Sequence, residues 1–290
     1  MSLNRLDPNA RTVLLTAAAM VAFAANSLLC RMALGARLID PASFTSVRLV
    51  AGALTLALVL LPRPAPRLPR PANWRTVLAL FGYMACFSFA YVSLSASTGA
   101  LILFGTVQTT MFVVAIGRGE AFSPLSWLGL GIAVGGIVYL LLPGLSAPDP
   151  LGAVLMAGAG ISWGIYSLLG RSAAEPVSAT ASNFLYSVPL ALAVSALFAR
   201  DFAVSPGGIA LAVASGAVSS GLGYVIWYAA LPRLRPTSAA AVQLSVPLIA
   251  AVGGVLLLAE APTLRLAVAS AATLGGVAIV LSQRAAKVRA

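Results

Sequence analysis

Ten apolar stretches divide this chain of 290 residues, and each is 18 to 23 residues long. Charged residues make up only 9% of the chain and gather between the stretches, and mean hydropathy is +0.98. About 20 residues of α-helix cross the ~30 Å hydrocarbon core of a bilayer. Backbone amides in lipid must be hydrogen-bonded within their own segment, and the stretches lack the alternation of a membrane strand. The sequence therefore predicts an all-α membrane protein whose ten transmembrane helices span 12–33, 42–61, 74–94, 99–117, 125–142, 151–170, 179–199, 207–229, 237–258 and 265–282.

An offset of 140 residues relates the two halves of the chain. The segments that recur at this offset are SLLCR at 27–31 and SLLGR at 167–171, Glu120-Ala121 and Glu260-Ala261, and Gly135-Gly136 and Gly275-Gly276. We interpret the chain as two five-helix repeats, residues 1–143 and 144–290. Because five is odd, the second repeat enters the membrane from the opposite side. Inverted repeats are the architecture of transporters that work by alternating access around a midplane site.

Basic residues are distributed unequally between the two sides of the predicted membrane. Alternate loops and termini carry 13 Lys and Arg on one side and three on the other, and Arg31 and Arg48 complete the 18. The positive-inside rule then places both termini in the cytoplasm. The net charge of +11 requires no nucleic-acid partner, since basic loops face anionic membrane lipid. We favour a stiff linker for the Pro-rich loop 62–73 over a segment that binds a partner.

Each repeat ends in a common pattern, Glu-Ala, a polar turn and an apolar helix with Gly-Gly, at 119–141 and 259–281. With Val-Arg-Leu at 47–49, this pattern resembles the EamA-type repeat of the drug/metabolite transporter superfamily. The resemblance covers nearly the whole chain. It implies a multi-pass transporter, and the length and helix count are similar to the branch of bacterial aromatic and other amino-acid exporters. It therefore implies a location in the bacterial inner membrane.

Polar and aromatic side chains at mid-depth are the candidates for substrate contact, because lipid-exposed polar groups are costly. Tyr83, Phe87 and Tyr91 share one helix face at spacings of four residues. The full set of predicted substrate-binding residues is Asn26, Tyr83, Phe87, Tyr91, Gln108, Trp163, Tyr166 and Gln243. Pro189 and Pro247 lie inside predicted helices, where each is either a hinge or a static kink, and Pro247 frees a carbonyl near Gln243.

The charged residues near helices have two interpretations each. Arg48 contacts a substrate carboxylate, or it extends to the headgroups or pairs with Asp40; we favour the second. For Arg31 we also favour extension to the headgroups. Glu120 and Glu260 directly precede predicted helices, whose positive N-terminal ends a carboxylate stabilises.

Titratable groups are missing from the middle of every predicted helix, and the chain has no His. Proton-coupled transport usually needs an intramembrane titratable group, so we expect uncoupled transport. The sequence offers no His or Cys cluster for a metal and no base to activate a nucleophile, so we expect neither enzymatic activity nor a cofactor.

These patterns together predict an inner-membrane exporter of amino acids, with aromatic or apolar ones as the first candidates, whose partners are its small-molecule substrate and membrane lipid. The first alternative is an exporter of other small metabolites or lipophilic cations. The second is a membrane-embedded enzyme or a scaffold without transport, which a bundle without a cavity would favour.

Overall fold

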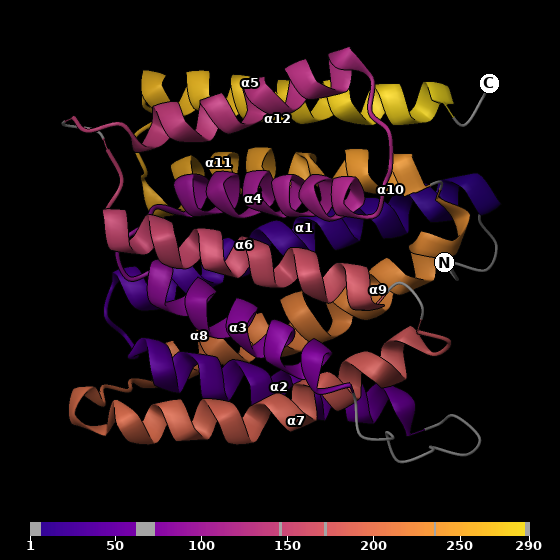
Figure 1. Ribbon diagram of the computed structural model, residues 1–290. Helices are drawn as coiled ribbons and strands as arrows, with labels where there is room; N and C mark the ends of the chain where they lie inside the picture. The colour runs from indigo at the N-terminus through magenta and orange to yellow at the C-terminus, as the bar shows by residue number, and fades with distance from the viewer. Residues whose placement is uncertain (1–6, 62–72, 145–146, 171–172, 235, 288–290) are drawn as a thin grey trace.

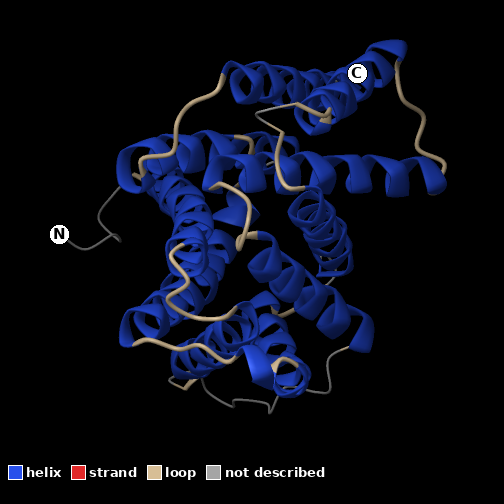
Figure 2. Ribbon diagram, turned by 90° about the vertical axis from the view of Figure 1, so that its left-hand side faces the viewer, coloured by secondary structure: helices blue, strands red, loops and turns tan. Residues whose placement is uncertain are grey.

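The computed structural model describes residues 7–61, 73–144, 147–170, 173–234 and 236–287. Within these residues the chain is helix and loop, with no strand (Figure 2). In the described part of the chain, nine helical spans are long and apolar enough to cross a membrane, and the 17-residue α3 completes the ten that were predicted. The spans are α1 (Pro8–Gly35), α2 (Pro41–Leu60), α3 (Trp74–Ala90), α4 (Ala96–Gly117), α5 (Pro124–Leu141), α6 (Pro150–Gly170), α7 (Pro176–Leu197), α8–η3–α9 (Pro206–Ala214, Ser215–Leu222, Gly223–Ala230), α10–α11 (Pro236–Gln243, Ser245–Leu258) and α12 (Leu264–Lys287).

Local sequence explains where many helices begin. Several start with Pro at the first helical position, directly after a residue whose side chain caps the helix. Asp40 is an example, because its Oδ1 accepts a hydrogen bond from the backbone N–H of Ser43 at 2.8 Å. Pro at this position loses no helical hydrogen bond, and an Asp or Ser cap satisfies a free amide.

The packing of α5 against α12 shows the two-fold relation between the repeats. A Cβ on Gly136 would lie 2.9 Å from the carbonyl oxygen of Ala269, and a Cβ on Gly276 would overlap the carbonyl oxygen of Gly129. Gly136 and Gly276 are 140 residues apart, and so are Gly129 and Ala269. The same contact is therefore made twice with the roles of the repeats exchanged. This confirms two inverted five-helix repeats.

Helices from the two repeats lie side by side through the bundle. The pair α5 and α12 forms its upper edge in Figure 1, and α2 packs against α7 at the opposite edge. The helix pairs α1·α11 and α4·α6 likewise join the repeats. Leucine and valine side chains such as Leu54, Leu58 and Val154 are more than 60% exposed on the outside of the bundle. A surface of this kind suits contact with lipid.

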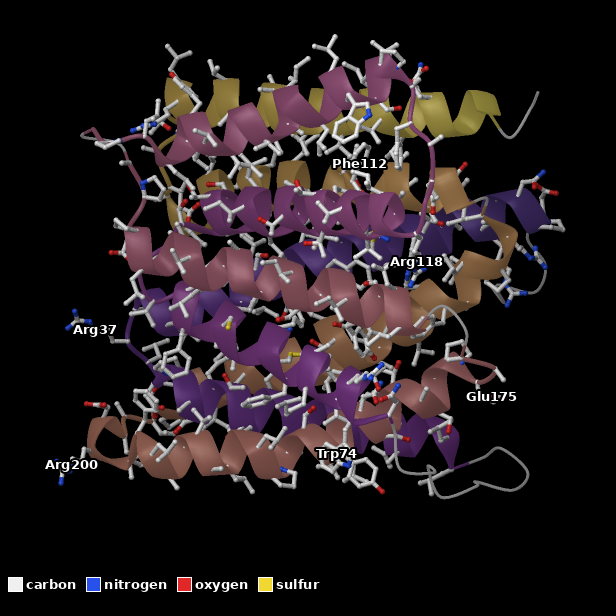
Figure 3. The ribbon with its side chains drawn as sticks, viewed as in Figure 1. Arg37, Trp74, Phe112, Arg118, Glu175 and Arg200 are labelled. Atoms are coloured by element: carbon white, nitrogen blue, oxygen red, sulfur yellow. The ribbon has the colours of Figure 1, made fainter. Side chains whose placement is uncertain are left out.

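The two ends of the bundle carry the groups of arginines that the loop count assigns to different sides. Both termini lie at the same end of the bundle (Figure 1). Arg37 and Arg200 project from the other end, whereas Arg118 lies toward the end that holds the termini (Figure 3). The assignment of the end with the termini to the cytoplasm stays a prediction. The Pro-rich segment 62–72 lies outside the described residues.

Candidate functional site

A small cavity lies in the centre of the bundle between helices of both repeats. Its volume is about 20 Å³, room for one water molecule. Five of the eight predicted substrate-binding residues line it: Asn26, Tyr83, Phe87, Trp163 and Gln243. The cavity is therefore lined by residues of α1, α3, α6 and the ninth span that the sequence had identified as candidates.

Aromatic rings form one wall of the cavity. The Trp163 ring lies 4.8 Å from that of Tyr83 and 5.4 Å from those of Tyr166 and Tyr224, between centroids. Phe23 of α1 packs edge-on against Tyr224 at 5.8 Å. Trp163 therefore connects rings on α3, α6 and α9, and these rings define an apolar surface for a ligand.

Arg48 of α2 is fully buried behind the cavity wall; it is not a lining residue itself, but it is bonded to Ser220 and Tyr83, which are. Its Nε and Nη2 both donate to Ser220 Oγ at 3.3 Å, and Nη2 also donates to Tyr83 Oη at 3.3 Å. The guanidinium carbon lies 5.0 Å from the centre of the Phe87 ring. Nη1 is buried without a hydrogen-bond partner.

The expectation that Arg48 extends to the headgroups or pairs with Asp40 was wrong. The Asp40 carboxylate instead accepts hydrogen bonds from the backbone N–H groups of Ser43 and Ala203. Arg48 is therefore held by hydroxyl groups and aromatic rings. An arginine cannot give up its proton at accessible pH, so its charge stays in the bundle.

Hydrogen-bond donors are left over around Arg48. Arg48 has only donors, so the oxygens of Tyr83 and Ser220 accept from it, and the proton of each hydroxyl is free to be donated. Ser219 Oγ is buried without a partner and lines the cavity with Ser220. The side of the cavity near Arg48 therefore offers donors with a net positive charge, which is the chemistry that binds a carboxylate.

A π-helical segment of the eighth span places the serines against Arg48. Segment η3 runs over Ser215–Leu222, and π-helical turns are frequent at functional sites. A Cβ on Gly216 would overlap the carbonyl oxygen of Arg48, so only glycine permits η3 to approach α2 this closely. Small residues thus bring η3 of the second repeat into contact with α2 of the first.

Asn26 fixes the position of Tyr83. Its Nδ2 donates to Tyr83 Oη at 3.2 Å, and its Oδ1 accepts from Ser215 Oγ at 2.7 Å. Asn26 is buried, with 5% of its surface exposed. A continuous network thus connects Ser215, Asn26, Tyr83, Arg48 and Ser220 across four helical segments.

Three predicted residues lie outside the cavity wall. Tyr91 is buried at the end of α3, where its ring contacts Phe87 at 4.7 Å and its hydroxyl donates to the carbonyl of Ala96 at 3.3 Å. Tyr166 packs behind Trp163, and its hydroxyl accepts a hydrogen bond from Asn183 at 3.3 Å. Gln108 is half-buried on α4 and is not among the lining residues. Their roles in binding stay predictions.

The two internal prolines differ in position. Pro189 of α7 is exposed on the outside of the bundle, and α7 is continuous there. Pro247 is buried in α11, and the ninth span is interrupted three residues earlier at Leu244. Pro has no N–H, so the carbonyl of Gln243, four residues before Pro247, lacks its usual helical donor.

Glu260 joins the repeats at the end of the bundle opposite the termini. Its carboxylate accepts hydrogen bonds from the backbone N–H groups of Ala96 at 2.6 Å and Ser97 at 3.4 Å, and from Ser97 Oγ at 3.1 Å. It therefore caps α4 of the other repeat, whereas we expected it to stabilise the helix that follows it. At the same end Arg31 donates to the backbone carbonyls of Tyr91 and Val92, so it caps α3 and is not a headgroup anchor.

Seven lining residues were not predicted: Phe23, Ser27, Leu103, Phe104, Ser219, Ser220 and Tyr224. The 140-residue offset contains a signal for two of them. Phe23 is the counterpart of Trp163, and Leu103 is the counterpart of Gln243. Applying the offset to each candidate would have found both. The serines of η3 carry no such signal, because their counterparts are Ala79 and Leu80.

Comparison with known proteins places the whole chain among transporters. The model of the EamA-like transporter family matches residues 10–142 and again 150–282. An uncharacterized protein of Pseudomonas aeruginosa is 49% identical over 277 residues, which cover 96% of each chain. An uncharacterized transporter of Archaeoglobus fulgidus is 27% identical over 95% of this chain and 99% of its own.

Two further comparisons concern substrate and fold. The threonine/homoserine exporter RhtA of Salmonella typhimurium is 33% identical over 148 residues, which cover 48% of this chain and 49% of RhtA. A solved crystal structure superposes with a TM-score of 0.66 at 18% identity, and the match covers 95% of this chain and 99% of the other. The second likeness shows the fold alone.

Proposed function

Because this chain belongs to the EamA-like transporter family, we propose that it exports amino acids with aromatic or apolar side chains across the bacterial inner membrane by alternating access. The observation that carries the proposal is the buried Arg48, whose Nη1 has no partner and whose hydroxyl partners Tyr83 and Ser220 line a cavity walled by aromatic rings. An amino acid complements both features, because its carboxylate accepts from the donors and its side chain packs on the rings. The partial likeness to the threonine/homoserine exporter RhtA supports amino acids as the substrate class, and the preference for aromatic or apolar side chains rests on the rings of the cavity wall alone.

The closed cavity fits one state of such a cycle. A space of about 20 Å³ holds no amino acid, so substrate binding requires the surrounding helices to separate. Alternating access moves one repeat against the other around the site, and the cavity is walled by helices of both repeats. In this proposal the structure represents a contracted form of the site, which widens when substrate binds.

Lipophilic cations fit the site poorly. Arg48 carries a positive charge, and the residues that line the cavity include no Asp or Glu to offset it. Burying a second cation beside Arg48 costs free energy through like-charge repulsion and lost hydration. The electrostatics thus favour a ligand with a carboxylate over the alternative cationic drug.

Proton coupling also lacks a carrier at the site. The residues that line the cavity include no Asp, Glu, His or Lys. We therefore propose uniport or exchange that follows the substrate gradient. In liposomes, a pH gradient imposed with the membrane potential clamped should produce no accumulation of a zwitterionic amino acid; accumulation against its concentration would contradict this part of the proposal.

Counterflow in liposomes tests the function itself. Vesicles with the purified protein are loaded with an unlabelled amino acid, and entry of the labelled form is followed for a panel that includes phenylalanine, leucine and threonine. We expect uptake above protein-free vesicles for apolar or aromatic members, and competition by other amino acids but not by tetraphenylphosphonium. Uptake of tetraphenylphosphonium, without uptake of any amino acid, would replace the proposal with the cationic alternative. No uptake of either would favour the scaffold.

A further inference from the structure

The break in the ninth span offers hydrogen-bond acceptors to the cavity that Arg48 supplies with donors. Helix α10 ends at Gln243, a turn follows at Leu244, and α11 starts at Ser245. The amide N–H of Leu244 donates to the carbonyl of Ala241 at 3.1 Å, and Ser245 Oγ donates to the carbonyl of Val242 at 2.6 Å. These local bonds satisfy the two carbonyls before Gln243, whose own usual donor is removed by Pro247.

This carbonyl belongs to a residue of the cavity wall. Gln243 lines the cavity, and its side-chain amide oxygen is a second acceptor. Interrupted helices with free backbone carbonyls at a midplane site coordinate cations in other transporters with inverted repeats. The ninth span thus combines a helix break, a carbonyl that has lost its usual helical donor and a position in the cavity wall.

The first repeat has no equivalent feature. At the 140-residue offset, Leu103 corresponds to Gln243 and Val107 corresponds to Pro247. Helix α4 is continuous over Ala96–Gly117, and Leu103 lines the cavity with hydrocarbon. The acceptors therefore occur in one repeat only, so the pseudo-symmetry of the fold does not require them.

From this asymmetry we infer that the break at Gln243 binds the ammonium group of the substrate. The inference rests on the proposed function, in which Arg48 binds the carboxylate. A primary ammonium has three N–H donors and no acceptor, and the lining residues offer it no carboxylate. The Gln243 carbonyl and amide oxygens fill that need. The site then selects zwitterionic α-amino acids over carboxylates of the same shape that lack the amine.

Phenylalanine and 3-phenylpropanoate form the matched pair of probes, since they differ only in the amine. Their affinities are measured with the purified protein as inhibition constants in liposome counterflow. We expect wild-type protein to prefer phenylalanine by about tenfold or more, the effect of losing a hydrogen bond to a charged group. Pro247→Ala restores an N–H that occupies the Gln243 carbonyl, so the preference should fall toward one while 3-phenylpropanoate binds unchanged.

Two variants accompany this measurement. Pro189→Ala makes the same change in a lipid-facing helix and should leave the preference at its wild-type value. Gln243→Leu introduces the residue found at the equivalent position of the first repeat, Leu103, and should lower the preference for phenylalanine without altering the backbone. This variant tests the inference even if Pro247→Ala misfolds. An unchanged preference in Gln243→Leu and in any folded Pro247→Ala protein, or no preference in wild type, would overturn the inference.

The outcomes also separate this inference from the proposed function. If both probes bind equally and both lose affinity in Arg48→Met, the carboxylate site stands and the ammonium site falls. If neither probe binds at all, the proposed function is contradicted, and this inference, which rests on it, is contradicted as well.

Discussion

Replacement of Arg48 by methionine separates a binding role from a structural one. Methionine keeps an unbranched, flexible side chain but is shorter than arginine, and it removes the charge and all the donors. In the structure the guanidinium is fully buried, is bonded only to hydroxyls at 3.3 Å, and has one nitrogen without a partner. We expect substrate binding to weaken strongly in Arg48→Met while the fold keeps its stability.

The size of the loss follows from the contacts that a carboxylate would make. A hydrogen bond to a charged group contributes about 1.5–3 kcal/mol, and pairing a buried donor also removes a penalty of about 1–3 kcal/mol. Truncating one partner of a buried, charged pair costs roughly 2–5 kcal/mol. At about 1.4 kcal/mol for each factor of ten, the affinity should fall at least 30-fold.

Stability should respond in the opposite sense. A buried charge without an oppositely charged partner is costly, and replacing buried ionic groups by apolar residues of similar volume is often neutral or stabilising by about 1–4 kcal/mol. Thermal unfolding of the purified protein in detergent should therefore show an unchanged or higher midpoint for Arg48→Met. The loss of the hydrogen bonds from Arg48 to Ser220 and Tyr83 acts against this gain. Water can take the place of the guanidinium as a partner of the two hydroxyls.

Arg31→Met is the matched control. Arg31 donates to the carbonyls of Tyr91 and Val92 at the end of α3, whereas Arg48 donates to two hydroxyls that line the cavity. Its replacement should lower the unfolding midpoint and leave inhibition constants for amino acids within about twofold of wild type. A lower midpoint for Arg48→Met with unaltered substrate affinity would refute the reasoning and make Arg48 a structural residue.

Three further predictions test the supports of the site. Gly216→Ala should destabilise the protein by about 1–3 kcal/mol and abolish transport, since a Cβ would push η3 away from α2. Gly131→Ala, with open space around its Cβ, should do neither, and comparable unfolding midpoints for the two variants would count against the close approach. Glu260→Ala should cost about 1 kcal/mol through loss of the α4 cap, measured by thermal unfolding, and Glu260→Gln should recover part of it; no change in either would remove the capping role. Trp163→Ala should cut flux in liposomes at unchanged membrane expression, because three ring contacts are lost, and unaltered flux would argue against the aromatic wall.

The helices and the repeat were predictable because the bilayer leaves the chain few choices. Hydrophobic length fixes each span, and the predicted helix 42–61 differs from α2 by one residue at each end. Pro247, inside the predicted helix 237–258, also indicated that the carbonyl of Gln243 lacks its usual helical donor. Such features depend on sequence within one turn or one span.

The surroundings of charged residues could not be predicted from local sequence. Arg48 was expected to leave the bundle because burial of a charge is costly, but the partners that tolerate it, Ser220 and Tyr83, come from other helices. Glu260 was assigned to the helix that follows it, whereas the nearest free amides in space belong to α4. The π-helical turn that holds Ser220 packs closely against α2 at Gly216, and no periodicity of the sequence indicates this turn. Each error concerns a contact between distant segments.

A structure determined with a bound amino acid, such as phenylalanine, tests the central claim most directly. The account predicts a carboxylate oxygen about 2.7–2.9 Å from Arg48 Nη1, in a cavity enlarged from its present 20 Å³, with the side chain against Trp163. A substrate bound between the repeats without contact to Arg48, or outside the bundle on its lipid-facing surface, would contradict it.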